Sequence, residues 1–246
     1  SFNRPTDVTW DPAGNIYVAD GYNNSRVVKL DKNGKWLKTW GERGTGPGQF
    51  NIPHTIASDA DGNIYVGDRT NRRIQVFGTD GTFKKFIFMN VPYDKSRHPV
   101  LGNKAPSPPD ETAPWAMCIT KGRPQYLFTV DSEPGRLYKI SIPDGKIVGY
   151  LGLSGREMGQ FNWPHGLACI DENTVRITSL SQEVEALRLA VPQLSQAGQG
   201  AEWLLAPFIL LFAIGLMLAT LPPRPSAPLD DEPRTANSET DSTRGA

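Results

Sequence analysis

Short runs in which apolar and polar residues alternate follow one another along most of the chain, separated by Gly-containing turns. Alternation with a period of two is typical of β-strands that bury one face. The pairs Asn33-Gly34 and Asp80-Gly81 are strong hairpin signals. The expected strands of the first unit are residues 6–10, 15–19, 26–30 and 36–40. The pattern therefore predicts an all-β chain built of hairpins.

The strand pattern itself repeats, because Phe2 and Phe50 begin similar units 48 residues apart. Asp11–Asp20 and Asp59–Asp68 share the sequence Asp-x-x-Gly-Asn-Ile-Tyr-Val-x-Asp. A recurring four-stranded unit of roughly 40–50 residues is typical of a β-propeller blade. Two further units are expected, one at residues 114–152 and one that begins at Pro164. The predicted fold is an all-β propeller with about four blades present of six.

The start of the chain falls inside a repeat, since the Gly-Gln that precedes Phe50 and Phe161 has no counterpart before Phe2. We therefore interpret the chain as the C-terminal part of a longer protein. The blades are expected over residues 1–190, with an insertion between the second and third at residues 89–113. Residues 174–191 depart from the repeat and fit either strands or a helix.

Beyond the repeats, an uncharged apolar segment runs from Trp203 to Leu221. As a helix it would span the hydrocarbon core of a bilayer, which is about 30 Å thick. We expect a linker at residues 191–202, a transmembrane helix at 203–221 and a disordered tail at 222–246. Arg224 and Arg234 follow the span closely, which favours a cytoplasmic tail and a membrane-anchored, extracytoplasmic propeller.

Charge and cysteine content exclude two classes of protein. The chain carries 26 Lys and Arg against 26 Asp and Glu, so no strongly basic nucleic-acid surface is expected. Two cysteines cannot form a disulfide scaffold. Cys118 and Cys169 follow the opening strands of the third and fourth units. Buried reduced thiols are the favoured interpretation, and a disulfide between neighbouring inner strands is the alternative in an extracytoplasmic domain.

Two of the three histidines, His54 and His165, occupy the same place in their repeats, directly after the proline that opens a unit. Thr6 and Trp115 are the equivalent residues of the other two units. The opening strand of a blade lines the central channel, so these four side chains should face it. A histidine on alternate blades would place three imidazoles around one axis, which is a zinc-binding arrangement. The alternative is that each histidine only hydrogen-bonds backbone in its turn. His98 lies in the insertion, where we expect a solvated loop residue.

Two loop residues break the repeat. Tyr22 is an extra residue after the second strand, and Arg69 stands where the preceding unit has Gly21. A phenol beside a metal can act in acid–base chemistry, and a guanidinium can bind a carboxylate. The competing interpretation is that both are exposed loop residues. Asp20 with Arg26, and Asp68 with Arg73, recur in both good repeats and are interpreted as ion pairs within a blade.

These motifs identify a resemblance. The units resemble NHL repeats, and residues 2–77 are closely similar to peptidyl-α-hydroxyglycine α-amidating lyases. The motifs that carry the similarity are Pro5-Thr6-Asp7-Val8, Asp20-Gly21-Tyr22-x-Asn24-Ser25-Arg26, Pro47-Gly48-Gln49-Phe50, Pro53-His54 and Asp68-Arg69-x-Asn71-x-Arg73-Ile74-Gln75. The similarity is weaker to about residue 168 and ends there. Gly166 stands where the family has an aspartate, and Asn23 where the animal enzyme has a cysteine.

The resemblance implies a six-bladed propeller with zinc held by three histidines in its channel. His54 and His165 match two of these ligands, Tyr22 matches the catalytic tyrosine and Arg69 an active-site arginine, and the third histidine is expected upstream of Ser1. A structural calcium ion is a further expectation. The implied reaction cleaves the C–N bond of a peptidyl-α-hydroxyglycine to an amide and glyoxylate, with a small peptide or N-acyl-hydroxyglycine as substrate. The alternative is a non-catalytic, membrane-anchored NHL propeller that binds a protein partner. Nucleic acid is expected in neither case.

Overall fold

The sheets follow the repeats one by one. The computed structural model of the chain describes residues 1–92, 112–132, 134–171, 174–179 and 183–188. The first sheet contains β1 (Asp7–Trp10), β2 (Ile16–Asp20), β3 (Arg26–Leu30) and β4 (Trp36–Trp40), and the second contains β7 (Pro53–Ser58), β8 (Ile64–Asp68), β9 (Arg73–Phe77) and β10 (Phe83–Ile87). The third contains β11 (Ala116–Ile119), β12 (Tyr126–Asp131), β13 (Arg136–Ser141) and β14 (Ile147–Leu151), and the fourth has β17 (Pro164–Cys169), β18 (Thr174–Ser179) and β19 (Glu183–Arg188).

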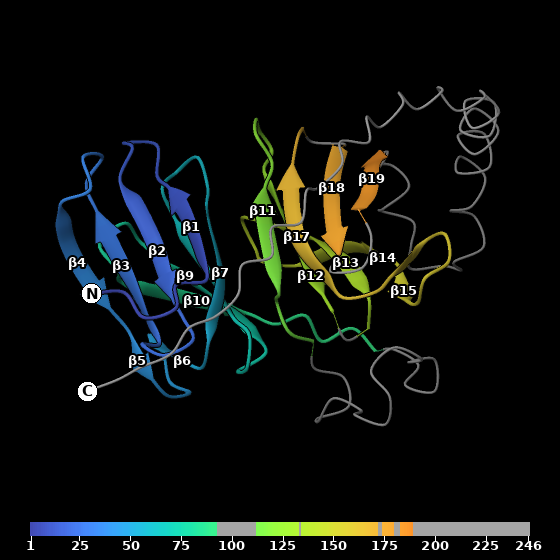
Figure 1. Cartoon of the computed structure of the whole chain (residues 1–246). Helices are drawn as coiled ribbons and strands as arrows, with labels where there is room; N and C mark the ends of the chain where they lie inside the picture. Colours follow the sequence, from blue (N-terminus) through green and yellow to red (C-terminus); the bar gives the residue numbers. More distant parts are fainter. Residues whose placement is uncertain (93–111, 133, 172–173, 180–182, 189–246) are drawn as a thin grey trace, which may run out of the picture. The chain divides into compact units, whose positions relative to one another are not determined.

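Each of these sheets is an antiparallel meander, in which neighbours along the chain are neighbours in the sheet (Figure 1). The four strands expected in the first unit are present, with ends that differ by one residue at most. Two short parallel pairs join consecutive sheets: β5 (Glu42–Arg43) with β6 (Gln49–Phe50), and β15 (Leu153–Ser154) with β16 (Gln160–Phe161). The all-β, propeller-like fold expected from the repeats is confirmed.

A buried aspartate organises the turn between the first two strands of a sheet. Asp11 Oδ1 accepts hydrogen bonds from the backbone N–H groups of Ala13 and Asn15, and its Oδ2 accepts one from the Tyr17 hydroxyl at 2.9 Å. Burial alone would raise the pKa of Asp11, but the hydrogen bonds from Asn15 and Tyr17 hold it below its ordinary value. Asp59 makes the same contacts in the second sheet. The recurrence of Asp, Asn and Tyr in the motif therefore has a structural cause.

The recurring Asp–Arg pairs stabilise each blade, as the sequence indicated. Arg26 lies 3.0 Å from Asp20 and Arg73 lies 3.0 Å from Asp68, and both aspartates are fully buried. The guanidinium of Arg73 also donates to the backbone carbonyls of Thr45, Gly46 and Gln49. These residues therefore fasten the loops between strands and are not part of the candidate site.

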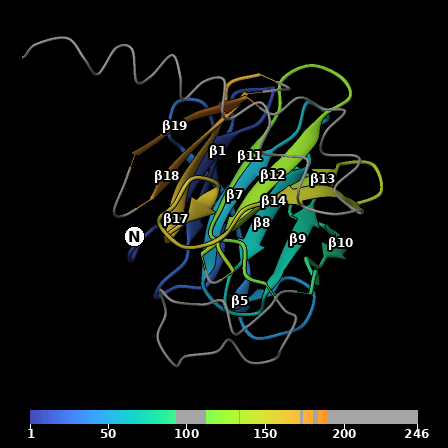
Figure 2. The same cartoon turned by 90° about the vertical axis from the view of Figure 1, so that its right-hand side faces the viewer.

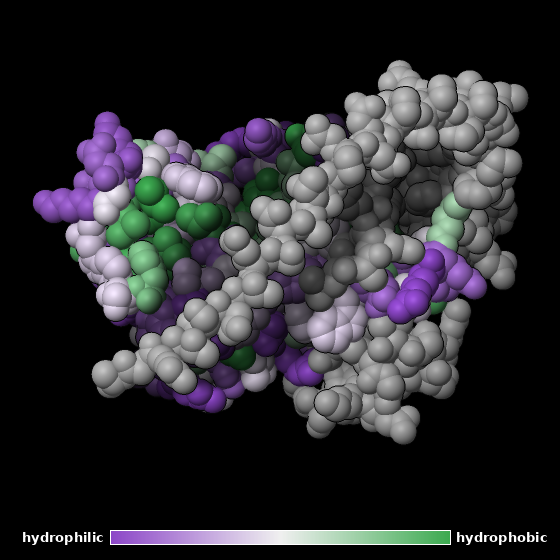
Figure 3. Space-filling model, in the orientation of Figure 1, coloured by the Kyte–Doolittle hydropathy of each residue, from purple (hydrophilic) through white to green (hydrophobic). Residues whose placement is uncertain are grey.

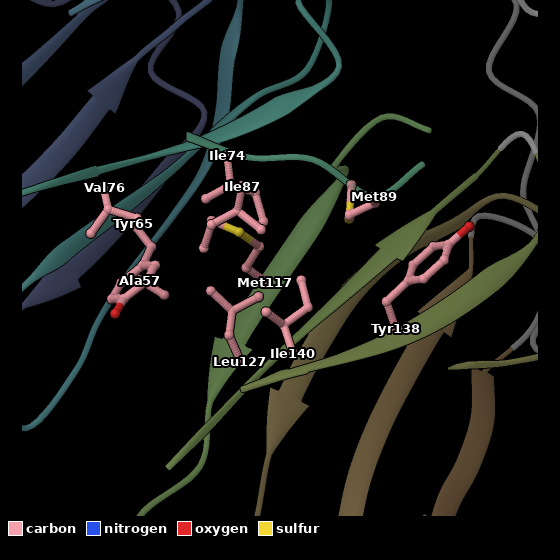
Figure 4. Close-up of a cluster of buried hydrophobic side chains, with 10 residues drawn as sticks. All are labelled: Ala57, Tyr65, Ile74, Val76, Ile87, Met89, Met117, Leu127, Tyr138 and Ile140. Carbon is pink, nitrogen blue, oxygen red and sulfur yellow. The ribbon is translucent and has the colours of Figure 1, made fainter. Parts of the chain in front are cut away.

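Apolar side chains fill the space between consecutive sheets. The cluster between the second and third sheets is shown in Figure 4; its members are Ala57, Tyr65, Ile74, Val76, Ile87, Met89, Met117, Leu127, Tyr138 and Ile140. A similar cluster between the first and second sheets includes Tyr17, Phe50, Ile56 and Phe77. The first strands of the sheets, β1, β7, β11 and β17, lie side by side in chain order (Figure 1), and Figure 2 views them from the side on which β17 lies. The starts of these four strands are therefore brought together.

Two expectations about the fourth unit are decided by the structure. Residues 174–179 and 183–188 form strands β18 and β19 and not a helix. The favoured interpretation of Cys118 and Cys169 as reduced thiols was wrong, because they form a disulfide with a Cα–Cα distance of 5.6 Å. Since β11 and β17 are neighbouring inner strands, the two cysteines point at each other across them. The disulfide thus joins the third sheet to the fourth.

One face of the first sheet has no covering sheet among the described residues. Val8 is 41% and Trp10 is 56% exposed, whereas Ile56, the equivalent of Val8, is 3% exposed. Figure 3 shows apolar side chains gathered on this face, over the dark blue strands of Figure 1. In the second sheet, the equivalent residue Ile56 packs against the first sheet. This face of a blade is therefore the one that contacts the preceding blade.

Several expectations fall on residues outside the described ranges. They are most of the insertion between the second and third sheets, with His98, and the linker, transmembrane helix and tail expected over 191–246. Within the described ranges, no helix is long and apolar enough to cross a membrane.

Candidate functional site

The two histidines predicted to share the channel lie side by side. His54 is on β7 and His165 on β17, and their ring centroids are 5.0 Å apart. Trp115, which directly precedes β11, lies between these strands; its ring centroid is 5.4 Å from that of His54 and 5.6 Å from that of His165. Three repeats therefore contribute one ring each to the same spot.

The chain turns sharply just before each Pro-His pair. Ile52 and Trp163 both adopt left-handed backbone angles, with φ of 62° and 55°. Bulky side chains rarely occupy this region, and residues before proline usually adopt extended angles. Such strain persists only where the surroundings impose it. Here it directs Pro53-His54 and Pro164-His165 into the innermost strands at the same angle.

His54 is held in one tautomer. Its Nδ1 lies 2.7 Å from the backbone carbonyl oxygen of Trp115. A carbonyl only accepts, so Nδ1 carries the proton and Nε2 keeps its lone pair. Burial, opposed by the hydrogen bond to Trp115 and reinforced by the nearby Arg69 and His165, lowers the pKa of His54 to about 4. His54 is therefore neutral near pH 7 and offers Nε2 as an acceptor or metal ligand.

Tyr22 reaches that free nitrogen. Its hydroxyl oxygen lies 3.3 Å from Nε2 of His54, and since Nε2 is the acceptor, the phenol donates. Tyr22 sits on the loop between β2 and β3, and 43% of its surface is exposed. The loop is close-packed at Gly21, where an added Cβ would lie 2.0 Å from the carbonyl oxygen of Pro53. The bare glycine lets the Tyr22 loop approach the Pro53-His54 strand.

Arg69 completes the group from the loop between β8 and β9. Its backbone N–H donates to the carbonyl of Ile52 at 3.1 Å. Its guanidinium carbon lies 4.6 Å above the Trp115 ring and 5.6 Å from the Tyr22 ring. No carboxylate among the described residues pairs with this guanidinium. The guanidinium of Arg69 therefore rests against two aromatic rings. Its N–H donors are available to a ligand.

The donor set fits part of a zinc site. The Nδ1 hydrogen bond of His54 to a carbonyl is the outer contact that a metal-ligating histidine makes. His165 brings a second imidazole to the same spot. No group of three or more His, Cys, Asp and Glu side chains in the described part of the chain is placed to hold a metal. These two imidazoles would be fewer than the three protein ligands of a catalytic zinc site.

Gly166 leaves no room for the aspartate that the resemblance would place beside His165. A Cβ at Gly166 would lie 2.1 Å from the hydroxyl oxygen of Thr178 on β18. The local structure is therefore adapted to glycine at this position.

The four residues proposed from the sequence, Tyr22, His54, Arg69 and His165, meet in one place. Sequence reasoning placed Trp115 at the channel but did not foresee its contacts with Arg69 and His54. It missed Trp163, whose ring centroid lies 5.6 Å from that of Trp115. The available signal was position, because Trp163 precedes Pro164-His165 just as Ile52 precedes Pro53-His54.

The chain is similar to several known proteins. Residues 2–30 and 50–77 match the NHL repeat family. The chain is 34% identical over 184 residues to peptidyl-glycine alpha-amidating monooxygenase A of Xenopus laevis. This alignment covers 72% of this chain and 18% of the relative. It is 40% identical over 79 residues to the probable peptidyl-alpha-hydroxyglycine alpha-amidating lyase pgal-1 of Caenorhabditis elegans. This alignment covers 31% of this chain and 23% of the relative. Among solved structures, the RRP9 WD40 repeats match with a TM-score of 0.49 at 14% identity, covering 74% of this chain and 50% of that one.

Residues 2–30 and 50–77 are NHL repeats, and the described part of the chain has a propeller-like, all-β fold. It spans less than a fifth of the length of the Xenopus relative that it matches. Within that span it resembles peptidyl-α-hydroxyglycine α-amidating lyase.

Proposed function

We propose that the chain forms part of a zinc-dependent lyase that cleaves the C–N bond of a peptidyl-α-hydroxyglycine to an amide and glyoxylate. The observation that carries the proposal is the meeting of Tyr22, His54, His165 and Arg69 at one point, although they come from three different repeats. The Caenorhabditis elegans relative, which is named a probable lyase, supports the same reaction class.

Each of the four residues has a role that its contacts support. His54 and His165 would hold the zinc ion, because Nε2 of His54 is the unprotonated nitrogen of its ring and the two rings are adjacent. Bound zinc would supply Lewis-acid polarisation of the substrate hydroxyl. Arg69 would bind the substrate carboxylate, since its guanidinium has no carboxylate partner among the described residues.

Tyr22 would handle the proton. Acting as the phenolate, its oxygen would accept the proton of the substrate hydroxyl, and the carbon–oxygen bond would become the carbonyl of glyoxylate. The electron pair of the C–N bond would move to nitrogen, which would take up that proton from Tyr22 and leave as the primary amide. The balance needs no oxidant or reductant. The exposed phenol suits this role because it can meet a substrate that enters from solvent.

The test uses the complete gene product, measured for metal and for activity. We expect about one zinc per chain by elemental analysis, and glyoxylate release from N-benzoyl-α-hydroxyglycine. The double variant His54→Ala/His165→Ala should lose both while Lys32→Gln, at an exposed turn residue outside the site, keeps both. A folded, zinc-loaded protein that releases no glyoxylate would contradict the lyase proposal.

A second candidate is a non-catalytic NHL propeller, anchored in the membrane by residues 203–221 and binding a protein partner outside the cytoplasm. The observation that favours it is Gly166, because Thr178 leaves no space for a carboxylate beside His165. Zinc content that survives loss of both histidines, together with absent lyase activity, would support this alternative.

A further inference from the structure

Trp115 makes a different kind of contact with each of two site residues. Its backbone carbonyl accepts the Nδ1 proton of His54, and the face of its ring lies under the Arg69 guanidinium. We propose that Trp115 is a positioning residue that fixes the imidazole of His54 and the guanidinium of Arg69 relative to each other. The inference rests on the proposed function, because it assigns Trp115 a part in binding the substrate carboxylate.

The backbone of Trp115 is well anchored. Its N–H donates to the carbonyl of Val130 on β12 at 2.9 Å. Two residues further on, the N–H of Met117 donates to the hydroxyl of Thr55 on β7 at 3.0 Å. These bonds tie the segment both to its own sheet and to the strand that carries His54. The carbonyl and ring of Trp115 are therefore presented from a rigid support.

Arg69 needs such a support. An arginine side chain without an ionic partner loses rotamer freedom when it binds a carboxylate, and that loss weakens binding. Stacking on an aromatic face restricts a guanidinium beforehand while its N–H donors stay free. The Trp115 ring, at 4.6 Å, is nearer to the guanidinium carbon than the Tyr22 ring at 5.6 Å, and Tyr22 is exposed. Trp115 is thus the main support of Arg69 in the structure.

The experiment measures how strongly the protein prefers a carboxylate. Binding of N-benzoylglycine and of its neutral counterpart, N-benzoylglycinamide, is followed by calorimetry on the complete protein. The wild type should prefer the carboxylate by about tenfold or more, as expected for a charge-assisted bond. Trp115→Leu should reduce that preference at least fivefold, and Trp115→Phe should keep most of it because an aromatic face remains. Trp36→Leu is the matched control, because Trp36 is an exposed tryptophan beside Arg26 outside the site, and it should leave the preference unchanged.

A double-mutant cycle with Arg69→Leu separates positioning from general destabilisation. If Trp115 acts through Arg69, Trp115→Leu should cost no further preference once Arg69 is removed. Additive effects, or an unchanged preference in Trp115→Leu, would overturn the inference and leave the proposed function intact. If Trp115→Leu does not fold, Trp115→Met, which keeps bulk but no aromatic face, takes its place, and a carboxylate preference in Trp115→Met equal to that of Trp36→Leu would overturn the inference. A wild type without any carboxylate preference would contradict the proposed role of Arg69, and this inference with it.

Discussion

The hydroxyl of Tyr22 lies 3.3 Å from Nε2 of His54, although 32 residues separate them in the chain. The contact joins two blades, because Tyr22 follows β2 of the first sheet and His54 lies on β7 of the second. It connects the acid–base residue proposed for the reaction directly to a proposed metal ligand. Loss of the exposed Tyr22 hydroxyl should therefore affect chemistry more than stability.

Tyr22→Phe should abolish glyoxylate release, with kcat falling by about 10²- to 10⁴-fold, which is the usual contribution of a general acid or base. Zinc content and the thermal midpoint should stay near wild type because the side chain is exposed. The measurements are steady-state kinetics, elemental analysis and thermal unfolding. Unchanged kcat in this variant would remove Tyr22 from the mechanism.

Gly21→Ala should disturb the contact between the two blades. Its new Cβ would lie 2.0 Å from the carbonyl oxygen of Pro53, a backbone atom that cannot move aside cheaply. We expect a loss of roughly 1–3 kcal/mol in the free energy of unfolding, together with reduced activity because Tyr22 moves away from His54. Gly46→Ala is the control, since its Cβ would meet only the flexible side chain of Gln49, at 3.1 Å. Equal stability of the two variants in chemical denaturation would contradict the tight packing at Gly21.

Reduction of the disulfide between Cys118 and Cys169 should destabilise the fourth sheet and with it the position of His165, which shares β17 with Cys169. Removing a native disulfide typically costs about 2–5 kcal/mol. We expect a lower thermal midpoint in dithiothreitol and in Cys118→Ser/Cys169→Ser. Dithiothreitol should have no further effect on the double variant. An effect of the same size in both proteins would show that reduction acts elsewhere.

The apolar face of the first sheet should bind hydrophobic probes. Val8 and Trp10 are exposed there, whereas the equivalent face of the second sheet is buried. The double variant Val8→Lys/Trp10→Lys should bind less bis-ANS, measured by fluorescence, and should self-associate less in sedimentation velocity. Its free energy of unfolding should stay close to that of the wild type. Ile56→Lys, the buried counterpart, should destabilise by several kcal/mol because it buries a charge. Dye binding that persists in the double variant would place the exposed apolar surface elsewhere.

Much of this architecture could be predicted from the sequence, because repetition makes weak local signals add up. The motif shared by Asp11–Asp20 and Asp59–Asp68 encodes its own turn, through an aspartate that bonds residues two, four and six positions ahead. Such short-range contacts are written in the spacing of residues. The equivalence of His54 and His165 also followed from the repeats, and since equivalent positions of successive blades face the same axis, their proximity followed too.

Only the tertiary structure decided the contacts between blades that do not recur from repeat to repeat. Whether Cys118 and Cys169 are reduced or joined depends on the separation and direction of two strands, which spacing along the chain does not specify. The tautomer of His54 is set by a carbonyl from another blade, and the Arg69 guanidinium is held by a ring from the same residue, Trp115. The sequence by itself determined the blades and the residues that face their axis. The packing of one blade on the next determined which of those residues touch, because that packing fixes the distances that hydrogen bonds and stacked rings require.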